Sequence, residues 1–255
     1  MIEPERHAYG RGRERFGELW PPASPDPEPW PVVVLLHGGF WRAGRTLESM
    51  RPLAIDLAGR DLAVWNLEFR RVGQYGGGWP GTLRDVATGI DHLIALAEHL
   101  PLDLERVTVI GHSAGGHLAL WAAARSRLPA RAPGARPKVV PRQVVSLAGV
   151  CDLVAAADEG IGEGAVRAFL RAGPEAEPER YRLASPLALL PTGVPAVLVH
   201  GEADTRVPVA QSRAYAAAAT AAGDRVDLVA LPGVDHAAPA DPGSPAWYEV
   251  LRRLG

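Results

Sequence analysis

Residues 107–117 read V-T-V-I-G-H-S-A-G-G-H, and this stretch decides how the rest of the chain is interpreted. A β-branched apolar run stops at Gly111, and an apolar helical pattern begins directly after Gly116. A strand that turns into a helix through G-x-S-x-G is typical of a nucleophile elbow, a turn so tight that its glycines have no room for a Cβ. The pattern predicts that Ser113 presents its hydroxyl at the start of a helix, where the helix dipole favours negative charge.

Strand-like and helix-like segments alternate on both sides of this turn. The run V-V-V-L-L-H at 32–37 is typical of a strand buried on both faces of a sheet. The alternation predicts an α/β fold, with a mostly parallel central sheet and helices on both faces. We expect residues 1–13 to lie loosely on the surface and 14–20 to form an edge strand. Further strands are expected at 62–69, 107–110, 143–148, 194–200 and 226–231, and helices at 47–59, 82–100, 114–127, 209–222 and 245–254.

The composition is that of an ordinary globular protein. The chain has 255 residues, 47% of them hydrophobic, and a formal net charge of −2. An α/β chain of this length is commonly one domain, so a single domain over 1–255 is expected. Without a basic patch or an apolar run of ~18 residues, neither a nucleic acid nor a membrane is expected as a partner. No secretory leader is recognisable, which predicts a cytoplasmic protein; the oligomeric state is left open.

The cysteine content limits the covalent and metal chemistry of the chain. Cys151 is the only cysteine, which excludes an internal disulfide and a cysteine-based zinc cluster. No metal or cofactor is expected.

Residues 151–191 break the alternation with acidic and glycine-containing turns, and we expect them to form a small lid insertion. Packing of the lid onto the body is the favoured role for four apolar residues of the segment, which are also candidates to face a pocket: Phe169, Leu170, Tyr181 and Leu183.

A glycine-containing loop follows the strand at 32–37. It reads H-G-G-F-W, residues 37–41, and ligands of parallel sheets bind at the carboxyl ends of the strands. Acyl transfer places negative charge on a carbonyl oxygen, which backbone N–H groups can stabilise. The predicted donors are the N–H groups of Gly39, Phe40 and Ala114, with Gly38 as an alternate. His37 is expected to brace the loop, and Trp41 and Trp79 are expected either to line the pocket or to pack in the core.

Two later loops supply candidates for a base and its orienting carboxylate. Asp204 lies in H-G-E-A-D-T-R-V-P, with Glu202 and Asp152 as competing carboxylates. His236 lies in L-P-G-V-D-H-A-A-P. It is the one histidine that lies in a loop after a strand and downstream of both Ser113 and Asp204. A nucleophilic serine needs a base, and the base needs a carboxylate that fixes its tautomer. The pattern therefore predicts a triad of Ser113, His236 and Asp204.

Together these motifs resemble those of the α/β-hydrolases. The resemblance covers about residues 14–254 and is nearest to the esterase group that includes hormone-sensitive-lipase-like carboxylesterases and kynurenine formamidases. The form H-G-G-x-W and the stretches W-N-L-E-F-R-R-V-G and G-G-W-P-G-T-L-R-D-V are similar to those of kynurenine formamidases. The resemblance implies Ser113 as nucleophile, His236 as general base, Asp204 as its orienter, and an oxyanion hole at Gly39, Phe40 and Ala114. Phe40 stands where many esterases carry a third glycine, which disfavours bulky acyl groups.

The expected activity is hydrolysis of small carboxylic esters or amides with a short acyl group, through an acyl-enzyme. The alternative is an arylformamidase that hydrolyses N-formylkynurenine, because Phe40 suits a formyl group. A non-catalytic α/β-hydrolase that serves as a binding protein is a third reading. A peptidase of the prolyl-oligopeptidase type is disfavoured because no propeller domain precedes the hydrolase unit, and a phosphate-binding loop because the required G-K-[S/T] is absent.

Overall fold

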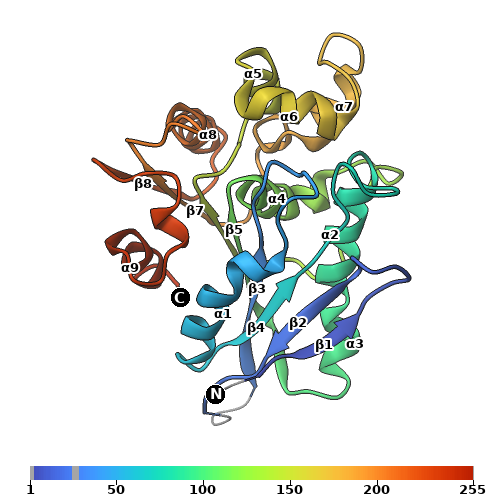
Figure 1. Cartoon of the computed structure of the whole chain (residues 1–255), viewed down its shortest axis with the longest axis vertical. Helices are drawn as coiled ribbons and strands as arrows, with labels where there is room; N and C mark the ends of the chain where they lie inside the picture. The colour runs from blue at the N-terminus through green and yellow to red at the C-terminus, as the bar shows by residue number, and fades with distance from the viewer. Residues whose placement is uncertain (1–2, 25–28, 255) are drawn as a thin grey trace.

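The computed structural model describes residues 3–24 and 29–254, and its strands form one twisted sheet (Figure 1). Eight strands lie in the order β1-β2-β4-β3-β5-β6-β7-β8. β2 runs antiparallel to both of its neighbours, β1 and β4, and the other neighbouring pairs are parallel, which confirms the predicted mostly parallel sheet. The strands are β1 (Glu5–Ala8), β2 (Phe16–Trp20), β3 (Trp30–Leu36), β4 (Ala63–Leu67), β5 (Leu102–His112), β6 (Gln143–Leu147), β7 (Ala196–Gly201) and β8 (Val226–Leu231).

The N-terminal segment corrects the prediction of a loose surface chain. Glu5–Ala8 forms β1, which pairs with β2 along the register Glu5↔Leu19 to Ala8↔Phe16, so β2 is not an edge strand. Most side chains of β1 are exposed, and the strand exists through its backbone hydrogen bonds to β2. The sequence of β1 has no alternation of apolar and polar residues, and the sequence analysis therefore did not predict this strand. Residues 1 and 2 lie outside the part that the structure describes.

Helices cover both faces of the sheet, as predicted. Along β3, Val32, Val34 and Leu36 enter one apolar cluster while Val33 and Leu35 enter the other, so the strand is buried on both sides. The first cluster contains side chains of α2 (Gly81–Asp91), α3 (Leu93–Ala97), α4 (Ala114–Ala123) and α8 (Ala210–Ala221). The second contains side chains of α1 (Arg51–Ala58) and α9 (Pro245–Leu251).

Several element bounds differ from those predicted. The helix expected at 82–100 is two helices, α2 and α3, separated at His92, and the apolar spacing continues across the break and hides it. The first turn of the helix expected at 47–59 is a 3₁₀ turn, η1 (Leu47–Met50), and Gly59 follows α1 as the predicted C-cap. β5 begins at Leu102 rather than Val107, because its first part carries exposed charges such as Arg106 that break the apolar run.

Residues 151–191 connect β6 to β7 through short helices gathered at one end of the molecule (Figure 1). These are α5 (Leu153–Asp158), α6 (Ile161–Leu170), α7 (Pro178–Ala184) and the 3₁₀ turn η3 (Pro186–Leu189). The segment is fastened to the body: Trp79 donates its N–H to the Phe169 carbonyl at 2.7 Å, and Trp121 Nε1 donates to the Leu183 carbonyl at 3.1 Å. The four candidates to face a pocket, Phe169, Leu170, Tyr181 and Leu183, all pack in the apolar core. Tyr181 and Leu183 also line separate surface hollows, and none of the four lines the cavity that contains Ser113.

Candidate active site

Ser113 lies at the predicted strand–turn–helix junction between β5 and α4. Its backbone is strained, with φ 57° and ψ −118°, and its N–H donates to the Leu147 carbonyl at 2.8 Å. The glycines around it are needed sterically. A Cβ on Gly111 would lie 2.0 Å from the Gly115 carbonyl oxygen, and a Cβ on Gly115 would lie 2.0 Å from the Leu36 carbonyl oxygen. At these two positions of the turn, therefore, only glycine fits.

This crowding gives a first prediction, for Gly111→Ala. The added methyl group meets backbone atoms that cannot move without disturbing β5 and α4, so the free energy of unfolding should fall by at least about 2 kcal/mol. Urea unfolding followed by tryptophan fluorescence measures the loss. Gly44→Ala is the matched control: no atom lies within 4 Å of the position that its Cβ would take, and stability should change by less than about 0.5 kcal/mol. Equal effects of the two substitutions would contradict the steric account.

A cavity of about 260 Å³ opens at the carboxyl ends of the strands and brings predicted site residues together. Ser113 and His236 both line it, although they come from loops after β5 and β8. Gly39 and Phe40, from the loop after β3, line the same cavity. The rest of the lining consists of Gly38, Arg45, Ser49, Met50, His112, Arg206, Ala237, Ala240 and Asp241.

Asp204 is the carboxylate that contacts His236. The distance from His236 Nδ1 to Asp204 Oδ2 is 2.6 Å, and both residues are buried. The competing carboxylates are engaged elsewhere: Asp152 caps α5 by accepting from the Val154 N–H, and Glu202 pairs with the exposed Arg213. Of the three candidates, the structure therefore brings Asp204 to the histidine.

A second histidine, His200, shares the same carboxylate oxygen. His200 Nε2 lies 3.2 Å from Asp204 Oδ2, and its Nδ1 lies 2.7 Å from Ser212 Oγ. The other oxygen, Oδ1, accepts the N–H groups of Arg206 and Val207 at 2.8 and 2.9 Å. Burial acts to raise the pKa of Asp204, but the hydrogen bonds from His200, His236 and the backbone outweigh burial and hold that pKa well below its ordinary value. Asp204 is therefore an ionised carboxylate with both oxygens occupied.

The loop after β3 has the backbone of an anion-binding turn. Gly39, Phe40 and Trp41 all have positive φ, at 110°, 51° and 56°. Among the described residues, the N–H groups of Gly39, Phe40 and Ala114 donate to no protein acceptor. A Cβ on Gly38 would lie 3.1 Å from Ser113 Cβ, so this loop passes directly beside the elbow. Free N–H groups next to a serine are what stabilisation of an oxyanion requires.

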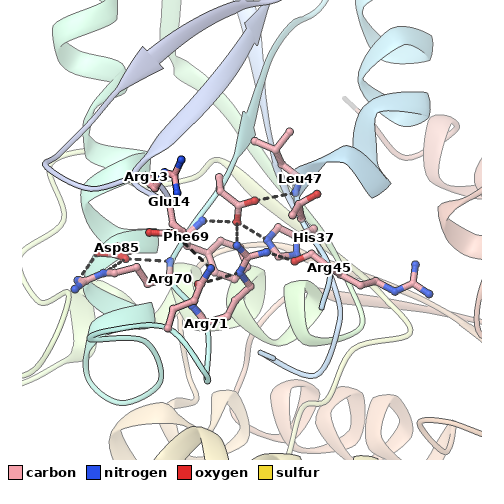
Figure 2. Close-up of polar contacts among 12 residues, drawn as sticks. Arg13, Glu14, His37, Arg45, Leu47, Phe69, Arg70, Arg71 and Asp85 are labelled. Carbon is pink, nitrogen blue, oxygen red and sulfur yellow. Dashed lines mark hydrogen bonds and ion pairs between the residues drawn. The ribbon is translucent and has the colours of Figure 1, made fainter. Parts of the chain in front are cut away.

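A buried polar cluster holds the start of this loop at His37 (Figure 2). His37 Nε2 lies 3.0 Å from Glu68 Oε1 and its Nδ1 lies 2.8 Å from the Gly38 carbonyl oxygen, which confirms the predicted bracing role. Glu68 also accepts the Leu47 N–H and pairs with Arg71 at 3.4 Å. Burial acts to raise the pKa of Glu68, but His37 and Arg71 outweigh burial and hold that pKa below its ordinary value, so the carboxylate is ionised.

The sequence did not reveal Glu68, Arg71, His200 or Ser212. A signal was present for two of them: His200 is a polar residue in the otherwise apolar strand β7, and Glu68 follows the buried strand β4. Polar groups at such places need buried partners, and the sequence does not say which partners they find.

His112, the residue before the nucleophile, ties the elbow to the loop of His236. Its Nε2 lies 2.8 Å from the His236 carbonyl oxygen, so the ring donates its proton there, and the two imidazole rings are 4.8 Å apart. Burial, followed by the charge of His236, lowers the pKa of His112 to about 4. The ring is neutral at pH 7 and acts as a fixed hydrogen-bond donor.

Trp41 and Trp79 do not line the cavity that contains Ser113. Trp41 is 1% exposed, stacks on Phe169 with ring centroids 4.8 Å apart, and donates from Nε1 to His117 Nδ1 at 3.1 Å. Trp79 lines a separate surface hollow with Pro129 and Arg131. The packing alternative therefore holds for Trp41, whose indole N–H finds a partner in the interior.

The buried ring of His117 gives a second prediction, on pH dependence. His117 accepts from Trp41 and donates from Nε2 to the Ala184 carbonyl at 2.9 Å, and burial lowers its pKa to about 4 from 6.5. Between these values the unfolded chain binds a proton that the folded chain does not. The stabilisation is thus complete above pH 6.5 and is lost as the pH falls toward 4, by up to about 3 kcal/mol.

Urea unfolding at several pH values between 7 and 4.5 measures this loss. The variant His117→Gln can still accept from Trp41 and donate to Ala184 but does not titrate, so its stability should depend less steeply on pH. Identical pH slopes for the two proteins would contradict the assignment.

No helix within residues 3–24 and 29–254 is long and apolar enough to cross a membrane.

Comparisons with known proteins find esterases that are similar to this chain. Esterase LipQ of Mycobacterium tuberculosis is 31% identical over 242 residues, which is 90% of this chain and 56% of the relative's length. Esterase LipC of the same organism is 26% identical and is covered over 60% of its length, so the chain spans little more than half of these relatives. Among solved structures, Esterase B of Lactobacillus rhamnosis (HN001) superposes with a TM-score of 0.84 at 20% identity, over 99% of this chain and 85% of that one.

The structural likeness supports the fold, and the family follows from the sequence. The model of the BD-FAE family matches residues 19–218, which is more than half of the chain. The predicted resemblance to α/β-hydrolases of the esterase and lipase group is thereby confirmed. The chain belongs to the BD-FAE family of α/β-hydrolases.

Proposed function

We propose that this chain hydrolyses small carboxylic esters with a short acyl group. The observation that carries the proposal is the convergence of four loops on one cavity: Ser113 and His236 line it with the Gly39–Phe40 turn, and Asp204 contacts His236 at 2.6 Å. The match to named esterases is a second support, since LipQ and LipC are both esterases. In this proposal Ser113 is the nucleophile, His236 the general base and Asp204 the residue that orients it.

The reaction proceeds in two acyl transfers. His236 Nε2 takes the hydroxyl proton of Ser113 as its Oγ attacks the ester carbonyl, and the imidazolium that forms is stabilised by Asp204. The carbonyl oxygen becomes an oxyanion held by the N–H groups of Gly39, Phe40 and Ala114. The C–O bond then breaks, and the alcohol leaves with the proton from His236. Water attacks the acyl-enzyme by the same route and releases the carboxylic acid.

The preference for a short acyl group rests on Phe40. This side chain is partly buried at the cavity wall, and a Cβ on Gly162 would lie 2.4 Å from Phe40 Cδ1. The ring therefore packs directly against the backbone of α6 and narrows the space beside the oxyanion loop. An esterase of Thermogutta terrifontis that superposes with a TM-score of 0.78 at 23% identity has been solved with butyrate bound, a short acid of the kind proposed here.

A panel of substrates tests the proposal. p-Nitrophenyl acetate, butyrate and octanoate should give falling kcat/KM with acyl length, and N-formylkynurenine should be turned over more slowly than the acetate. Faster turnover of N-formylkynurenine than of the acetate would make the chain an arylformamidase, the alternative that Phe40 also suits. Failure of a fluorophosphonate probe to label Ser113, with no turnover of any member, would favour a non-catalytic binding protein.

A further inference from the structure

Two arginines, Arg45 and Arg206, line the cavity of Ser113 and His236. Both side chains are exposed, and neither guanidinium has a hydrogen bond or ion pair with any residue that the structure describes. In Figure 2 the side chain of Arg45 extends away from the buried cluster that holds its backbone carbonyl. Some exposed arginines, such as Arg60 and Arg182, pair with carboxylates at 2.9 and 2.6 Å, so Arg45 and Arg206 differ from these in having side chains free to meet a ligand.

Both arginines are placed by the reaction machinery itself. A Cβ on Gly39 would lie 2.9 Å from Arg45 Cβ, so the stem of Arg45 packs on the oxyanion loop. The backbone N–H of Arg206 donates to Asp204 Oδ1 at 2.8 Å. The two cations are thus attached to different parts of the site, one beside the oxyanion loop and one beside the triad carboxylate.

The lining of this cavity has more positive than negative side chains, whereas the whole chain has a formal net charge of −2. Asp241 is the one carboxylate that lines the cavity, and it already accepts the Gly243 N–H at 2.9 Å. An adjoining hollow of about 580 Å³ shares Phe40 and Arg206 with the cavity and is also lined by Arg42, Glu159 and Glu163. The lining of the cavity that contains the nucleophile therefore carries two arginines against one carboxylate. Arginine binds carboxylates in a planar, bidentate manner.

We propose that the preferred substrates are short-chain acyl esters whose leaving alcohol carries a carboxylate, which Arg45 and Arg206 bind. The anion belongs on the leaving group because Phe40 leaves little room on the acyl side. Arg206 lies at the junction with the adjoining hollow, so a leaving group larger than the first cavity can extend past it. The proposal rests on the esterase activity proposed above and adds the substrate class.

A matched pair of acetyl esters tests the charge preference. 4-Acetoxybenzoate and 4-acetoxybenzamide have nearly the same shape and acyl group and differ in the charge of the leaving group. The ratio of their kcat/KM values, anionic over neutral, should fall about fivefold in Arg45→Gln and in Arg206→Gln and more in the double variant, mainly through KM. Arg225→Gln is the control, since this exposed arginine lines a hollow at the amino end of β8 and should leave the ratio unchanged. Raising the salt concentration should lower the wild-type ratio.

A ratio that survives in the double variant, or that falls equally in Arg225→Gln, would overturn the proposal. A binding measurement keeps this outcome separate from failure of the esterase activity. Ligand-observed NMR on Ser113→Ala should show 4-hydroxybenzoate bound more tightly than 4-hydroxybenzamide, and this difference should vanish when both arginines are replaced. Equal binding of the two phenols overturns the proposal whether or not the wild-type chain turns over an ester.

Discussion

Ser113→Ala is expected to lower kcat/KM for p-nitrophenyl acetate by at least about 10³-fold. The variant loses the atom that would attack the carbonyl, while the N–H groups of Gly39, Phe40 and Ala114 remain. Residual turnover above that of water should therefore persist from binding and oxyanion stabilisation alone. Because Ser113 lies at φ 57°, alanine at the same position keeps the backbone strain, and stability should change little.

Initial rates and labelling by a fluorophosphonate probe measure this effect together. Ser126→Ala is the matched control, because Ser126 is exposed at the end of the elbow helix region and away from the cavity. It should be labelled and active like the wild type. If Ser113→Ala retained more than a tenth of the activity, or still reacted with the probe at one site, the nucleophile would have to be another residue.

Asp204→Asn is expected to cost on the order of 10³- to 10⁴-fold in kcat, for a reason fixed by the hydrogen bonds. The oxygen at Oδ1 must accept from the Arg206 and Val207 N–H groups, so an asparagine would place its carbonyl oxygen there and its NH₂ group at the position of Oδ2. That NH₂ group then faces His236 Nδ1, which has to become an acceptor. The proton of the ring moves to Nε2, and a ring protonated there cannot take the proton of Ser113.

The rate of Asp204→Asn should recover partly at high pH, where hydroxide can replace the base. Glu202→Gln is the control that separates the two carboxylates of the same loop, and it should retain wild-type kcat because Glu202 pairs with Arg213 on the surface. A loss in Glu202→Gln as large as that in Asp204→Asn would contradict the assignment. The pH–rate profile and circular dichroism of each variant distinguish a wrong tautomer from a disturbed fold.

The residues with a direct role in the proposed chemistry were accessible from sequence because the fold restricts where they can be. Ser113 can be predicted because it lies in a turn that requires glycines. Asp204 and His236 can be predicted because they follow strands whose carboxyl ends meet at one edge of the sheet. The order of the strands in the sheet therefore predicts which of these residues meet, although they lie far apart in the sequence. Contact between Asp204 and His236 was predicted in this way and is present.

The buried residues that hydrogen-bond to this machinery could not be predicted from the sequence. His200 and Ser212 support Asp204 from β7 and α8, and Glu68 supports His37 from the end of β4. A polar side chain in a buried strand needs a hydrogen-bond partner, but only the packing of distant segments decides which residue becomes that partner. Trp41 shows the same limit, because an aromatic residue beside a catalytic loop fits a pocket wall or a core equally well, and here Phe169 covers it. β1 was missed because its strand is made by backbone pairing.

The burial of α4 and the position of β8 have a consequence for heat inactivation. All ten residues of α4 are buried, and its strand β5 lies in the middle of the sheet, so Ser113 is held by the most protected part of the molecule. His236 follows β8, an outer strand whose side chains are partly exposed. Local opening should begin at such an edge, because fewer contacts hold it. On warming, base and nucleophile should therefore separate before the core melts, and a brief return to low temperature should restore activity.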